Sequence, residues 1–115
     1  MAIVNITTQN DADFIRQFAY QTVSGVPIDL TGNKLRMGVR RHAEDVAEQM
    51  LLTTENGGLE ISDAVNGKFT VWIKQDDLER QQLGDYDHSL IRFPPTGMQL
   101  RIWSGLLTIN AGPSR

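Results

Sequence analysis

Alternation of apolar and polar side chains over residues 67–74 limits what this chain can fold into more than any other feature. Phe69, Val71 and Ile73 share one parity, while Lys68 and Thr70 fall on the other. A period of two is the period of a β-strand with one buried and one solvated face. We therefore expect a strand here, at the centre of a sheet.

The same alternation returns along the rest of the chain. It is clearest over residues 34–40, where Leu35, Met37 and Val39 share the apolar parity. Further short strands are expected over residues 13–22, 49–54, 59–61, 84–90 and 98–110. Arg16 is an exception, because it falls on the apolar parity of its segment. Turn signals recur about every ten residues, and seven or eight short strands at this spacing predict a two-layer β-sandwich.

No segment has a convincing helical pattern. Residues 41–49 carry apolar side chains near helical spacing, but the stretch is short and we expect a loop. Asp76 or Asp77 would cap a single helical turn over residues 78–82. In the last strand, the apolar side chains change parity around Gly105, which predicts a β-bulge at that glycine.

Size and composition exclude several classes of protein. The 115 residues suffice for one domain, and a hydrophobic content of 40% is ordinary for a globular protein. The absence of cysteine excludes disulfides, thiolate nucleophiles and Cys-ligated zinc. Because 11 basic residues face 14 acidic ones, we expect no nucleic-acid partner. We also expect neither membrane insertion nor a secretory signal, since no basic start precedes a long apolar run.

Catalytic and metal-binding patterns are weak. The two histidines, His42 and His88, are accompanied by no nucleophile elbow and no phosphate-binding glycine loop. Asp85 and Asp87 would share one face of a strand, with His88 on the opposite face. We therefore predict no catalytic residue, no metal site and no cofactor. An enzyme would require a histidine to meet one of these aspartates in a cleft.

Three large apolar residues are candidates for an interface. Trp72 lies opposite the buried parity of its strand, and Ile91 and Phe93 lie opposite Tyr86 in theirs. Exposed apolar side chains can mark a protein interface, and tryptophan is enriched in binding hot spots. The alternative is that a loop, the second sheet or the N-terminal segment covers them. Trp103 is expected in the core.

The sequence Leu83-Gly84-Asp85-Tyr86 resembles the corner before the sixth strand of immunoglobulin-like sandwiches. In that corner a tyrosine hydroxyl binds the upstream backbone and fixes the crossing between the two sheets. The resemblance implies structural roles for Leu83, Gly84 and Tyr86. The fold prediction is an all-β, immunoglobulin-like antiparallel β-sandwich of seven or eight short strands over residues 13–110. Residues 1–12 would form an N-terminal arm or edge strand, and residues 111–115 a C-terminal tail.

Three segments together are similar to small phage virion proteins with immunoglobulin-like folds, related to the N-terminal domain of baseplate upper proteins. The segments are Ser24-Gly25-Val26-Pro27-Ile28-Asp29-Leu30-Thr31-Gly32, then 61–71 with its Asn66-Gly67 turn, and finally Leu83-Gly84-Asp85-Tyr86 followed by residues 103–109. The similarity covers most of the chain from about Asp13 onward. His88-Ser89 departs from the family, where Tyr-Asp is common at this place.

The resemblance implies a non-enzymatic structural component of a tailed bacteriophage or prophage particle. Such an assembly module would stand in a baseplate, tail, head decoration or fibre base, with other virion proteins and copies of itself as partners. It would be made in the cytoplasm of the bacterial host and reside in the virion. The alternative is a module that binds a carbohydrate or host-surface receptor through its end loops, residues 41–49 and Pro94-Pro95-Thr96-Gly97.

Overall fold

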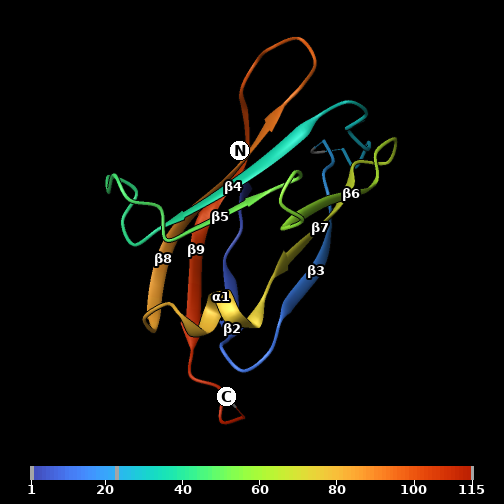
Figure 1. The fold of residues 1–115 in the computed structure, drawn as a ribbon. Coiled ribbons are helices and arrows are strands. Elements are labelled where there is room, and N and C mark those ends of the chain that lie inside the picture. The colour runs from blue at the N-terminus through green and yellow to red at the C-terminus, as the bar shows by residue number, and fades with distance from the viewer. Residues whose placement is uncertain (1, 23, 115) are drawn as a thin grey trace.

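The computed structural model describes residues 2–22 and 24–114, which form nine strands and one short helix (Figure 1). In chain order the elements are β1 (Ala2–Ile3), β2 (Ile6–Gln9), β3 (Phe14–Ala19), β4 (Lys34–Arg40), β5 (Met50–Thr53), β6 (Leu59–Asp63), β7 (Lys68–Ile73), α1 (Gln75–Glu79), β8 (Gly84–Phe93) and β9 (Leu100–Asn110). Met1 and Arg115, at the ends of the predicted arm and tail, lie outside the described residues. No described helix has the length and apolar character needed to cross a membrane.

The strands form two sheets. The larger, six-stranded sheet has the order β1-β9-β8-β4-β5, with β2 also paired to β9, and the smaller sheet has the order β3-β7-β6. The predicted β-sandwich is therefore confirmed, with nine described strands instead of seven or eight. As expected from its alternation, β7 is the central strand of the smaller sheet.

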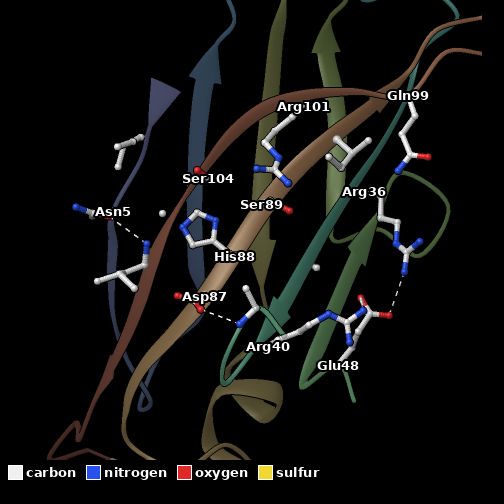
Figure 2. A pocket seen from close by; sticks show the side chains of 16 residues that line it. Asn5, Arg36, Arg40, Glu48, Asp87, His88, Ser89, Gln99, Arg101 and Ser104 are labelled. Atoms are coloured by element: carbon white, nitrogen blue, oxygen red, sulfur yellow. Dashed lines mark hydrogen bonds and ion pairs between the residues drawn. The ribbon is translucent and has the colours of Figure 1, made fainter. Parts of the chain in front are cut away.

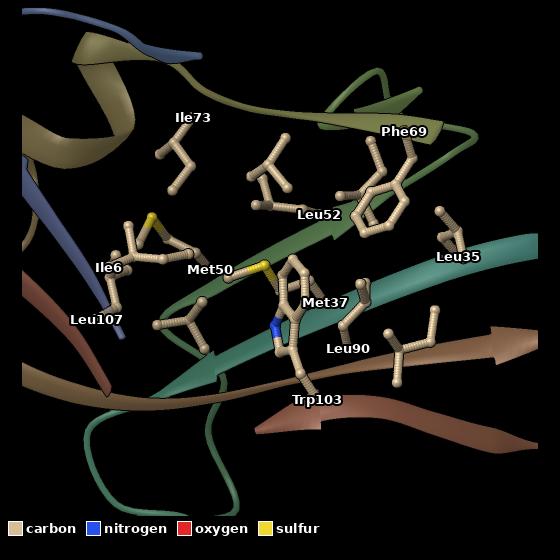
Figure 3. Close-up of a cluster of buried hydrophobic side chains, with 14 of the residues drawn as sticks. Ile6, Leu35, Met37, Met50, Leu52, Phe69, Ile73, Leu90, Trp103 and Leu107 are labelled. Carbon is tan, nitrogen blue, oxygen red and sulfur yellow. The ribbon is translucent and has the colours of Figure 1, made fainter. Parts of the chain in front are cut away.

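The core lies between the two sheets and takes the residues that the alternation assigned to it. Phe69, Val71 and Ile73 of β7 are fully buried, as are Met37 and Val39 of β4. Trp103 is also buried and packs close to Phe69, with ring centroids 5.5 Å apart (Figure 3). Each of these side chains stands on the inward parity of a strand, so strand period and burial agree.

The N-terminal residues depart from the predicted strand direction and follow one of the two alternatives predicted for them. Both β1 and β2 pair in parallel with β9, so the sandwich is not purely antiparallel. Ile6 of β2 belongs to the core, so residues 2–9 are edge strands of the sandwich and not an arm that orders on a neighbour. Between β1 and β2, the carbonyl oxygen of Val4 lies 2.9 Å from Nε2 of His88.

The helix and the bulge also differ from expectation. The helix covers Gln75–Glu79 and has Lys74 at its N-cap position without a side-chain cap, so neither Asp76 nor Asp77 caps it. Instead Asp13, 62 positions away, accepts a hydrogen bond from the Gln75 backbone N–H at 2.7 Å. The bulge lies where Leu90 and Ile91 face Trp103 and Arg101, so Ile102 is the extra residue and Gly105 is not. Residues 41–49 form a loop, as predicted.

Candidate interaction surfaces

The turn before β8 has the corner geometry that the sequence suggested. The hydroxyl of Tyr86, only 2% exposed, donates a hydrogen bond of 2.6 Å to the carbonyl of Gln82. Gly84 has a φ of 123°, a conformation that favours glycine because a Cβ would be strained there. The guanidinium of Arg41 lies 4.8 Å from the Tyr86 ring centre and donates to the carbonyl of Leu83 at 3.4 Å. Leu83 itself is half exposed.

The strand order and this corner define the class of the fold. The order β9-β8-β4-β5 matches strands G, F, C and C′ of an immunoglobulin-like sandwich, and β3-β7-β6 matches B, E and D. The tyrosine near the start of strand F makes the hydrogen bond expected of that fold. The protein is therefore an immunoglobulin-like β-sandwich.

Comparisons with known proteins add only distant likenesses. No protein-family model and no curated protein matches the chain. Among solved structures it is similar to murine CRIg at 17% identity and a TM-score of 0.44, with 94% of this chain and 92% of that chain covered. It is also similar to extracellular domains 3–5 of Drosophila OTK, at 15% identity and a TM-score of 0.35. There 93% of this chain covers 33% of the other, so it spans about a third of that length. The class assignment rests on strand order and corner.

The outer face of the six-stranded sheet carries a groove of about 760 Å³ (Figure 2). Its floor is made of small residues aligned across three strands, since Gly38 pairs with Ser89 and Ser89 pairs with Ser104. Apolar side chains stand at the two ends of this row, where Leu51 pairs with Gly38 and Ile3 with Ser104. Both apolar side chains are exposed. Of these two side chains, Ile3 lines the groove, whereas Leu51 lies outside its lining.

Charged side chains of both signs line the groove. Arg36 pairs with Glu48 at 3.1 Å, and Arg40 approaches the same carboxylate at 3.9 Å (Figure 2). Asp87 accepts a hydrogen bond from the backbone N–H of Ala43 at 2.8 Å. Arg101 also lines the groove, and no ion pair between described residues includes it. Three arginines against two carboxylates make this face locally more positive than the chain, whose net charge is −3.

The three predicted interface residues do not form one site. Ile91 pairs with Arg36 and Phe93 with Lys34, which places both on the outer face of the six-stranded sheet. Ile91 lines the groove and is half buried, as is Phe93. Trp72 stands on the outer face of the other sheet. An interface that used all three residues at once would have to contact both sides of the sandwich.

Trp72 is neither fully exposed nor fully covered. It is 37% exposed, and its indole N–H donates to Asp13 at 3.1 Å. The ammonium of Lys74 lies 5.3 Å from the ring centre. Hydrogen bonds from the Gln75 N–H and from Trp72 lower the pKa of the Asp13 carboxyl. Ile15, the cross-strand neighbour of Trp72 on the outer face, is 63% exposed.

The polar cluster before and after Tyr86 is divided between two faces, as its parity predicts. Asp85 accepts from the Thr108 hydroxyl at 2.7 Å on the outer side, where Asp87 also lies. His88 is buried on the inner side, and burial is the main cause that lowers its pKa. Among the described residues, no three metal-ligating side chains gather into a group that could hold an ion. The expected lack of catalysis stays a prediction.

The two end loops lie at opposite ends of the sandwich (Figure 1). Arg40, before loop 41–49, pairs with Asp87, whereas Lys34 pairs with Phe93, next to the 94–97 tip. The seven residues of β4 separate the two loops, which at about 3.3 Å per residue is roughly 20 Å. The two loops therefore do not lie together at one end of the sandwich.

Sequence reasoning missed the floor of the groove. Glycine and serine carry no hydropathy signal, so Gly38, Ser89 and Ser104 were not predicted as site residues. The available signal was their shared outward parity, together with the glycine inside the clearest strand of the chain. Recognising them as one row required the register between β4, β8 and β9, which only the fold supplies.

Proposed function

We propose that this protein is a non-enzymatic structural component of a tailed bacteriophage or prophage particle, where it acts as an assembly module. The segment-by-segment resemblance described above supports the phage assignment. The observation that carries the assembly role is the groove on the six-stranded sheet, with its floor of small residues between Ile3 and Leu51. A floor of small residues leaves room for side chains of another protein.

The chemistry of the groove supports a protein partner over a reactive substrate. Except for Arg101, its charged groups already bind one another or the backbone, as Arg36 does with Glu48 and Asp87 with Ala43. Such groups give orientation and specificity at a rim more than affinity. Exposed Ile3 and Leu51 add the apolar area that a stable contact needs. The partners are other virion proteins and copies of this chain, and the protein resides in the virion after synthesis in the host cytoplasm.

Purified particles test this function directly. Particles from the strain that encodes the protein are banded in a density gradient, and their peptides are identified by mass spectrometry. We expect peptides of this protein to co-sediment with capsid and tail proteins at constant stoichiometry. Their absence from particles of full infectivity would refute the proposal.

A groove variant then tests the surface. Ser89→Trp fills the floor from a half-buried position, whereas Thr96→Trp adds the same side chain at the exposed 94–97 tip. We expect the first variant to be lost from particles and the second to be retained, with both folded by circular dichroism. Retention of Ser89→Trp would show that the groove is not the assembly surface. Loss of Thr96→Trp alone would favour recognition through that loop.

A further inference from the structure

One edge of the three-stranded sheet is open. β3 lies at the end of the order β3-β7-β6, and among the described residues its only ladder partner is β7. In the immunoglobulin-like arrangement this edge is where strand A pairs with strand B. Here the N-terminal strands β1 and β2 both pair with β9 of the other sheet instead. The edge of β3 is left without a neighbour.

The direction of the free backbone groups on β3 follows from two hydrogen bonds. The backbone N–H of Tyr20, which is in register with Gly67, donates to the Gly67 carbonyl at 2.8 Å. The even-numbered residues of this strand therefore direct their backbone N–H and C=O groups toward β7. The backbone N–H of Trp72, opposite Ile15, donates to the carbonyl of Gly58 at 2.8 Å and therefore points away from β3. Ile15, Gln17 and Ala19 consequently direct their N–H and C=O groups toward the open edge.

Apolar surface lies on both sides of this edge. Phe14 and Phe18 stand on the inward parity of β3, yet they are only half buried. Their partners on β7, Ile73 and Phe69, are fully buried. On the outer face, Ile15 is exposed beside Trp72. A strand added at the edge would cover apolar side chains inside and outside at once.

The edge carries only one of the features by which proteins discourage strand addition, the charge of Arg16 on the inward parity, and it has neither a proline nor a bulge. The residues of β3 are Phe-Ile-Arg-Gln-Phe-Ala, with one charge and no proline. The opposite edge strand of the same sheet, β6, carries a register shift near Ile61 and two acidic residues. Strand β5, at one end of the other sheet, has only four residues.

The neighbouring sheet does not block access to β3. The inward residues of β2, Ile6 and Thr8, are 1% and 3% exposed, so they lie beneath the smaller sheet. If β2 projected beyond β3, these side chains would face solvent. Ile15, Gln17 and Ala19 are all exposed.

The sequence of β3 is complementary to itself. In an antiparallel pairing centred on Gln17, Ile15 of one copy faces Ala19 of the other, and Gln17 faces Gln17. All three edge-directed residues then take part in hydrogen-bonded pairs. Arg16 faces Phe18 of the other copy, a contact it already makes within the chain at 5.5 Å from the ring centre. Centring the pairing on Arg16 would instead oppose two guanidinium groups, which is unfavourable.

We infer that β3 pairs with β3 of a second copy, so that the two smaller sheets join into one continuous sheet across a twofold axis at Gln17. This names a partner for the proposed assembly role and takes its biological meaning from that role. The pairing itself is a property of the purified protein, so it can fail while the virion assignment stands, and the reverse.

Single cysteines test the pairing on a clean background, because the chain has none. In Gln17→Cys the two sulfurs meet on the axis, where opposed Cα atoms are about 5.5 Å apart, within the range that disulfides span. Glu60→Cys is the matched control, because Glu60 and Gln17 both pair with Thr70 in one cross-strand row. Under mild oxidation we expect most of the Gln17→Cys protein as a disulfide-linked dimer and most of the Glu60→Cys protein as monomer.

A second pair of variants removes the interaction. Gln17→Pro deletes an N–H that faces the open edge, and Ile15→Lys places a charge opposite Ala19 without changing the backbone. Sedimentation velocity of the unmodified chain should show a concentration-dependent dimer, and both variants should stay monomeric. If Gln17→Pro does not fold, Ile15→Lys decides. A wild-type monomer at all concentrations, or equal cross-linking of the two cysteine variants, would overturn the inference.

Discussion

The corner hydrogen bond of Tyr86 makes a stability prediction that can be worked through from the structure. In Tyr86→Phe the ring stays in its buried place and only the donor to the Gln82 carbonyl is lost. A single intramolecular hydrogen bond contributes about 1 kcal/mol net, and a partner left unpaired adds to that. Gln82 is exposed, so its carbonyl can bind water instead. We therefore expect a loss of about 1 kcal/mol, or ~4 °C in Tm.

Removing the ring tests packing in place of the hydrogen bond. Tyr86→Ala deletes a buried aromatic side chain and the surface on which Arg41 lies. Substitutions of buried aromatic residues by alanine cost about 3–5 kcal/mol. The ratio of the two effects then measures how much of the corner is hydrogen bond and how much is packing.

Urea unfolding monitored by tryptophan emission gives the free energy of unfolding for each variant, with an unchanged slope as the check on two-state behaviour. Tyr20→Phe is the control, because in the described part of the chain the Tyr20 hydroxyl has no hydrogen-bond partner. That substitution should leave the free energy of unfolding within about 0.5 kcal/mol of the wild type. If Tyr86→Phe is no more destabilising than Tyr20→Phe, the corner hydrogen bond does not stabilise the fold.

Three further predictions concern His88, Gly105 and Asp13. Burial lowers the pKa of His88 below the ordinary 6.5, so the unfolded chain binds a proton that the folded chain does not. The free energy of unfolding should therefore be constant above the ordinary pKa and decrease as the pH falls below it. His88→Gln should remove this decrease in Tm between pH 7.5 and 5, whereas His42→Gln should not. In Gly105→Ala the new Cβ would overlap the Val4 carbonyl; we expect a loss of about 1–3 kcal/mol in urea unfolding, and none for Ser104→Ala. Asp13→Ala removes the acceptor for Trp72 and Gln75; a larger fraction of tryptophan emission should become quenchable by acrylamide, and an unchanged fraction would contradict this contact.

Strand parity predicted most of the core because burial on a strand depends on residues two apart, which the sequence displays directly. Phe69, Val71 and Ile73 are buried for this reason, and His88 is separated from Asp87 for the same reason. The predicted position of the bulge was wrong because a glycine in a strand can have two causes, a change of faces or the close approach of another backbone segment. Gly105 is glycine because the Val4 backbone passes close to it, and not because the strand changes faces there.

Long-range partners could not be predicted in this way. The parallel pairing of β2 with β9 joins residues about a hundred positions apart, and apolar spacing does not encode strand direction. The residue that binds the first N–H of α1 is Asp13, 62 positions away in the sequence. The sequence pattern therefore favoured Asp76 or Asp77, which lie next to the helix start, as caps. The groove could not be predicted for the same reason, because the residues of its floor come from three strands.

Arg16 shows what an exception to parity can mean. A charged residue on the apolar parity of a strand is costly if that position is covered on all sides. Its neighbours Phe14 and Phe18 keep the alternation, so the strand assignment is sound, and the position must be open to solvent. The structure places it on the edge strand, exposed and lying over Phe18. An isolated arginine within an otherwise regular apolar parity thus indicates a strand that lacks one neighbour in the folded chain.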